Sequence, residues 1–68
     1  MPALPKTLSD DERDAVEVGF YRVWRQEPGD LYEFVVREAT AFIEENPGFA
    51  GLRPLVEKEF LRLARLER

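Results

Sequence analysis

Residues 28–48 read PGDLYEFVVREATAFIEENPG, and this stretch decides the fold. Pro-Gly stands at its start and Asn-Pro-Gly at its end, and both sequences interrupt a helix because proline lacks the backbone N–H and glycine favours turns. Asp30 is followed three residues later by Glu33, which is the spacing of a capping box at a helix N-terminus. We therefore predict a helix over residues 31–46.

This helix carries the widest apolar surface in the chain. At about 100° per residue, its apolar side chains cover roughly 140° of the circumference, and Phe34 extends the far edge. We expect it to be the central helix, with more apolar surface than two neighbouring helices cover. The side chains of this surface are Leu31, Tyr32, Val35, Val36, Ala39, Phe42 and Ile43.

A second helix is predicted over residues 10–27. Ser9 and Glu12 have the spacing of a capping box, and the acids that follow Ser9 suit the positive end of the helix dipole. The Pro28-Gly29 pair that follows ends the helix. Gly19 permits another backbone to approach closely. The expected buried stripe consists of Val16, Phe20, Val23 and Trp24.

A third helix is predicted over residues 52–67. Pro54 suits its first turn, where a backbone N–H would have no partner within the helix. Residues 49–51 are expected to be a connection. The expected inner stripe of the helix consists of Leu52, Val56, Phe60 and Leu63.

Together, the three stripes predict an all-α, compact, bundle-like three-helix domain over residues 9–68, because short connections cannot leave such surfaces in water. Residues 1–8 contain two prolines and no periodic pattern, which predicts an extended N-terminal arm. Helices that alternate in direction are the simplest topology. A crossed, helix-turn-helix-like arrangement is the alternative.

The composition argues against several classes of function. The chain has 68 residues, 44% of them hydrophobic, with no cysteine and no histidine. It therefore lacks disulfides, the usual zinc ligands and the usual catalytic base, and we expect no enzyme activity, cofactor or metal site. The acidic run at residues 10–14 lacks the spacing of a calcium loop. No apolar run resembles a signal peptide or reaches the roughly 18 residues of a membrane span, so we expect a cytoplasmic protein without membrane contact.

Two carboxylates, Glu38 and Glu59, fall by helical phase within or at the edge of an apolar arc. A carboxylate-based enzyme would need the two to face each other across a pocket. The alternative is that each lies at the rim of the core, with its charge paired to an arginine or solvated. We favour the rim, because structural ion pairs are commoner than catalytic carboxylates.

Glu44 and Glu45 lie at the negative end of their expected helix, which is unfavourable unless the charges are neutralised. Arg53, just across the connection, is the expected partner. The alternative is a basic group supplied by a binding partner.

A basic stripe on the third helix is formed by Lys58, Arg62 and Arg65, which share one face at spacings of four and three residues. The stripe suggests a small regulator that contacts nucleic acid. The net charge of −4, from 14 acidic and 10 basic residues, disfavours this function.

The aromatic residues favour a different function, because Tyr21, Trp24, Tyr32 and Phe49 cannot all fit one small core. Aromatic side chains and arginine are enriched in protein interfaces, and a domain this small gains stability from association. The leading hypothesis is a non-enzymatic protein–protein interaction module or homo-oligomeric subunit, whose partner is another protein or a second copy. The expected contact residues are Val18, Tyr21, Trp24, Arg25 and Tyr32.

Overall fold

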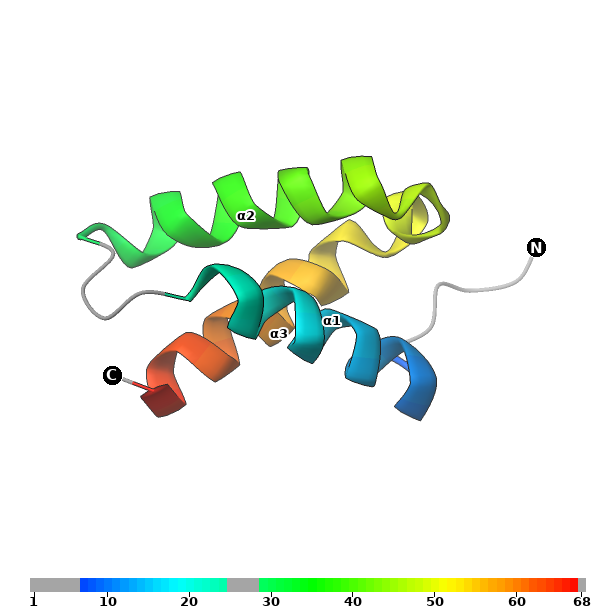
Figure 1. Cartoon of the computed structure of the whole chain (residues 1–68), viewed down its shortest axis with the longest axis horizontal. Helices are drawn as coiled ribbons and strands as arrows, with labels where there is room; N and C mark the ends of the chain where they lie inside the picture. Colours follow the sequence, from blue (N-terminus) through cyan, green and yellow to red (C-terminus); the bar gives the residue numbers. More distant parts are fainter. Residues whose placement is uncertain (1–6, 25–28, 68) are drawn as a thin grey trace.

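The computed structural model describes residues 7–24 and 29–67, and helices dominate this part of the chain (Figure 1). The elements, in chain order, are α1 (Asp10–Val23), α2 (Leu31–Glu45), the 3₁₀ helix η1 (Pro47–Leu52) and α3 (Arg53–Glu67). Neither described range contains a strand. The predicted all-α, three-helix domain is confirmed.

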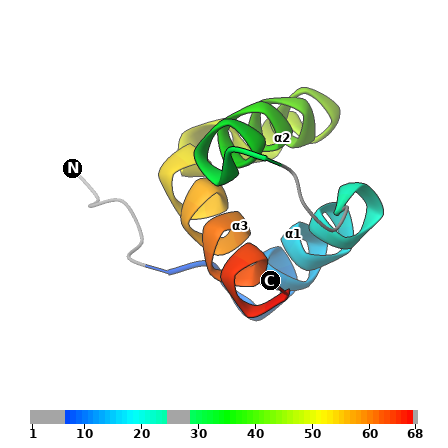
Figure 2. The ribbon, with the colours of Figure 1, turned by 90° about the vertical axis from the view of Figure 1, so that its left-hand side faces the viewer.

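Successive α-helices run in opposite directions, as Figure 1 shows for α1, α2 and α3. The view along the bundle in Figure 2 places α2 above and α1 and α3 beside each other below it. α1 and α3 cross at an angle, so the packing is less regular than in a parallel bundle. α3 packs against both α1 and α2, which contact each other less, so α3 is the central helix and the expectation that α2 is central is wrong.

α1 begins as predicted and ends early. The Ser9 hydroxyl accepts from the Glu12 N–H at 3.2 Å, and the Glu12 carboxylate accepts from the Ser9 N–H at 2.8 Å, which completes the capping box. Trp24 is already extended, with φ −63° and ψ 128°, so the predicted helical end at residue 27 is wrong. The Trp24 ring stacks on Phe20 at 5.2 Å and meets Phe34 edge-on at 5.4 Å, so its side chain joins the core where the helix stops.

The capping box predicted for the start of α2 is present in part. The Asp30 carboxylate accepts from the N–H groups of Tyr32 at 2.9 Å and Glu33 at 3.2 Å. The helix ends at Glu45, one residue before the predicted end, because Asn46 leaves the helical region and forms the C-cap. The predicted connection after it is the 3₁₀ helix η1, whose Phe49 packs on Phe42 with ring centroids 5.0 Å apart.

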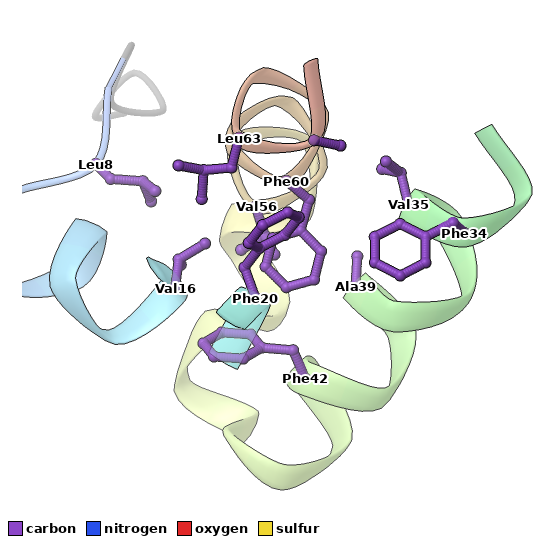
Figure 3. Close-up of a cluster of buried hydrophobic side chains, with 11 residues drawn as sticks. Leu8, Val16, Phe20, Phe34, Val35, Ala39, Phe42, Val56, Phe60 and Leu63 are labelled. Atoms are coloured by element: carbon purple, nitrogen blue, oxygen red, sulfur yellow. The ribbon is translucent and has the colours of Figure 1, made fainter. Parts of the chain in front are cut away.

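The core is centred on two rings, Phe20 of α1 and Phe60 of α3, which lie 5.7 Å apart (Figure 3). Phe34 of α2 meets Phe20 edge-on at 6.1 Å. Leu8, the last residue of the expected arm, is also buried, so the segment before α1 helps to close the core. The buried apolar side chains are Leu8, Val16, Phe20, Phe34, Val35, Ala39, Phe42, Val56, Phe60, Leu63 and Ala64.

The buried face of α2 differs from the predicted one. Phe34, expected at the edge, is 3% exposed, whereas Tyr32 and Val36 are 68% and 46% exposed. The reason is the position of α1, whose Phe20 contacts Phe34 and so turns the Phe34 side of α2 inward. Part of the predicted apolar surface of α2 consequently faces outward.

Gly19 provides a test of the packing between α1 and α2. A Cβ at this position would lie 2.6 Å from Cδ1 of Phe42, a ring that is itself packed against Phe49 and Phe60. We expect Gly19→Ala to lower the free energy of unfolding by about 1–2 kcal/mol, because overpacking outweighs the gain in helix propensity of about 1 kcal/mol.

Urea and thermal unfolding measure this effect, with Gly48→Ala as the matched control. A Cβ at Gly48 would meet nothing within 4 Å, so the control should be as stable as the original chain or more stable. Equal stability of the two variants would contradict the close packing at Gly19.

Candidate functional site

The expected contact residues of α1 are partly exposed. Val18 and Tyr21 are 57% and 50% exposed, and the Tyr21 hydroxyl donates a hydrogen bond to Oε2 of Glu67 at 3.1 Å. Trp24 is half-buried, because its ring packs on the core. Arg25 lies outside the described residues. Val18 and Tyr21 therefore remain accessible, while Trp24 contributes mainly to packing.

Tyr32 lies apart from this group. Residues two positions apart on a helix point about 160° away from each other. Phe34 faces α1, as its contact with Phe20 shows, so Tyr32 points away from α1. The structure does not bring Tyr32 together with Val18 and Tyr21.

By contrast, the basic stripe is brought together in a groove on the outer side of α3, which we call the α3 groove. Lys58, Arg62 and Arg65 all line it, as the sequence suggested. The segment before α1 and the first turns of α1 supply its other wall. The lining residues are Thr7, Leu8, Arg13, Leu55, Lys58, Glu59, Leu61, Arg62, Arg65 and Leu66.

The apolar members of the α3 groove were missed by the sequence analysis. Leu55, Leu61 and Leu66 lie outside the inner stripe of the third helix, and this second group of leucines was the available signal. Leu66 is 66% exposed, which makes it one of the most exposed large apolar side chains in the described part of the chain. Leu8 had no such signal, because nothing in the pattern of the arm indicated burial.

One cation of the groove is neutralised. The Arg62 guanidinium donates to Glu59 through Nη2 at 2.6 Å and Nε at 3.0 Å, and its Nη2 lies 3.7 Å from Oε2 of Glu17. Arg13, Lys58 and Arg65 make no ion pair with the residues that the structure describes. The groove is therefore cationic, although the chain as a whole carries a net charge of −4.

Glu59 is held as an anion at the inner edge of the groove. Its residue is 9% exposed, and the hydrogen bonds from Arg62 hold the pKa of the Glu59 carboxyl below its usual range, against the opposing effect of burial. A carboxyl that holds its negative charge so firmly suits an ion pair better than a proton donor.

Glu38 does not face Glu59. It lines a second groove, between α1 and α2, and lies 3.2 Å from Nε of its neighbour Arg37. The two carboxylates occupy different grooves, so the shared pocket that paired acid–base chemistry would need is not formed by them.

The prediction that Arg53 neutralises Glu44 and Glu45 is wrong. Arg53 instead pairs with Glu57 one turn later, with Nε 3.0 Å from Oε2, and donates through Nη2 to the Thr40 hydroxyl of α2. In the described residues, Glu44 and Glu45 are exposed and have no ion pair.

The described ranges offer neither a metal-binding cluster nor a membrane-spanning helix. They contain no cluster of three or more histidine, cysteine, aspartate or glutamate residues that could hold a metal ion. None of their helices is long and apolar enough to span a membrane.

Comparison of the chain with protein-family models, with curated proteins and with solved structures found no match. The residues of the two grooves are therefore the basis for assigning a function.

The Glu59–Arg62 pair gives a prediction about pH. The pKa of Glu59 is lower in the folded chain than its ordinary value of 4.5, so the pair stabilises the fold above that pH and the contribution is lost as the pH falls through the folded value. We expect Glu59→Gln to lower the urea midpoint at pH 7 and to lower it much less at pH 3.

Urea unfolding of both chains at the two pH values measures this difference. Glu44→Gln, at an exposed position without an ion pair in the described part of the chain and at the negative end of α2, is the control and should not lower the midpoint at either pH. A loss of the same size at both pH values would show that the Glu59 charge does not contribute.

Proposed function

We propose that this chain is a non-enzymatic protein–protein interaction module that binds an acidic, amphipathic helix in the α3 groove. The observation that carries the proposal is the combination of leucine side chains and unpaired cations in one groove on the outer side of α3. The exposed Leu66 and the half-buried Leu61 lie on α3 beside Lys58 and Arg65, and the opposite wall adds the exposed Arg13 beside the buried Leu8.

The leucines favour a helical ligand. An amphipathic helix binds a groove by placing apolar side chains at spacings of three and four residues against apolar walls. α3 has 15 residues and so offers a length of about 22 Å, at 1.5 Å per residue. This length accommodates several turns of a bound helix.

The charges favour an acidic ligand. Arg13, Lys58 and Arg65 are exposed, and only the Glu59 charge stands against the cations that line the groove. Because the chain as a whole carries a net charge of −4, the cationic groove is the part of its surface that favours an acidic partner. Charge complementarity thus selects both the partner and its position.

Binding of a synthetic peptide tests the proposal. The probe is a labelled, helix-forming peptide of about 15 residues that has leucine on one face and glutamate on the other, and its counterpart has lysine in place of glutamate. We expect fluorescence anisotropy to detect the glutamate peptide only. The double variant Lys58→Glu/Arg65→Glu should bind it at least about tenfold more weakly.

The matched control is Arg22→Glu/Arg37→Glu, which changes the net charge equally at exposed cations outside the α3 groove. It should bind the peptide within about threefold of the original chain, since only long-range attraction is reduced. Equal binding of both peptides, or equal losses in the two double variants, would overturn the proposal.

Nucleic-acid binding is the second candidate function, because Lys58, Arg62 and Arg65 all line one groove. The engagement of Arg62 by Glu59 leaves fewer free cations for phosphates. If this function holds, the chain binds a labelled DNA or RNA oligonucleotide in moderate salt. The variant in which Lys58, Arg62 and Arg65 are all replaced by alanine does not bind the oligonucleotide. Absence of binding in low salt would exclude it.

A further inference from the structure

An apolar stripe runs along the outer side of α2. Tyr32, Val36 and Thr40 follow at spacings of four residues and so share one face. Tyr32 and Val36 are 68% and 46% exposed. Tyr32 and Val36 are the part of the predicted apolar surface of α2 that lies outside the core.

One hydrogen bond places this stripe beside a stripe of α3. Arg53 donates through Nη2 to the Thr40 hydroxyl, and Arg53 also pairs with Glu57, four residues further along the same face of α3. Leu61 and Arg65 continue that face at the same spacing. We call the combined surface the α2–α3 face, and its residues are Tyr32, Val36, Thr40, Arg53, Glu57, Leu61 and Arg65.

The two edges of the α2–α3 face have opposite charge. Lys58 lies next to Arg65 around α3, and neither has an ion pair within the described ranges. On α2, Glu33 and Glu44 border the apolar stripe on the side away from the core, and both are exposed and unpaired within those ranges. The α3 edge is therefore basic and the α2 edge acidic.

We infer that the occupant of this face is a second copy of the chain, with α2 of each copy packed on α3 of the other. The inference rests on the proposed function and names its partner. The acidic, apolar side of α2 is itself an acidic amphipathic helix surface of the kind that the α3 groove accepts. α2 and α3 have 15 residues each, so their lengths match.

The arrangement of the edges selects a closed dimer. The α2 stripe and the α3 stripe belong to one face of the molecule. A two-fold axis therefore places the α2 stripe of each copy on the α3 stripe of the other and leaves neither stripe free for further copies. Packing α3 on α3 would instead place Lys58 and Arg65 opposite like charges, which is unfavourable. The result is a two-layer arrangement in which the α2–α3 pair of one copy packs on the α2–α3 pair of the other.

Sedimentation equilibrium over a range from low to high micromolar concentration tests the inference. The original chain should pass from monomer to dimer and should not form larger species. Val36→Glu changes an exposed side chain and should weaken the dimer at least tenfold, because it places a charge in the apolar centre of the interface. A monomer at every concentration would overturn the inference.

A charge exchange makes the test specific to the proposed geometry. Lys58→Glu/Arg65→Glu and Glu33→Lys/Glu44→Lys should each be monomeric, since each places like charges across both contacts of the dimer. An equimolar mixture of the two variants should form a dimer, because every contact in the mixed pair again joins opposite charges. Failure of the mixture to dimerise, with both variants folded by circular dichroism, would rule out the pairing of α2 with α3.

The two proposals fail in different ways. Glu33→Lys/Glu44→Lys retains an intact α3 groove, so it should still bind the glutamate peptide although it no longer dimerises. A chain that binds the peptide and never dimerises refutes the second copy as partner and leaves the interaction module standing. If either double variant by itself dimerises as strongly as the original chain, the charge complementarity on which the inference depends is refuted.

Discussion

The contact of Phe20 with rings of both other α-helices is the constraint on which the rest of the structure depends. Phe20 is 0% exposed and lies 5.7 Å from Phe60 of α3 and 6.1 Å from Phe34 of α2. Edge-to-face contacts of this kind restrict the relative orientation of the rings as well as burying apolar surface. Because the chain has no cysteine or histidine, and hence neither a disulfide nor the usual ligands of a structural zinc, this aromatic packing has a large share in holding the helices together.

The orientation of α2 follows from that constraint and has a consequence for function. Once Phe34 faces α1, helical geometry places Tyr32 on the other side of α2 and leaves Val36 beside it, so apolar surface that a symmetric bundle would bury becomes available to a partner. α3 shows the same division between an inner apolar side and an outer groove of leucines and cations. Glu59 lies at the boundary and engages Arg62, while Lys58 and Arg65 remain unpaired within the described residues.

Much of this organisation could be predicted from the sequence. Ser9 with Glu12 and Asp30 with Glu33 correctly indicated two helix starts, and the grouping of Lys58, Arg62 and Arg65 on one face was correct. The early end of α1 at Val23 was not predicted: Trp24 is already extended and its ring packs against Phe34, a residue of another helix that no local pattern places there. The partner of Arg53 was missed for a similar reason: Glu57 is one turn away, whereas Thr40 is close only after α2 and α3 have packed.

The sequence by itself determined the number of helices, their starts and the apolar stripe that each must bury, because capping, helix-breaking residues and periodicity act over a few neighbouring positions. Only the tertiary structure decided which part of the wide apolar surface of α2 is buried, since that depends on where the Phe20 ring meets α2. The tertiary structure also brought Leu8 and Arg13 to the outer side of α3, where they complete a groove that no stretch of sequence contains. Burial and charge neutralisation are properties of contacts between helices, so they become visible only when the helices are placed together.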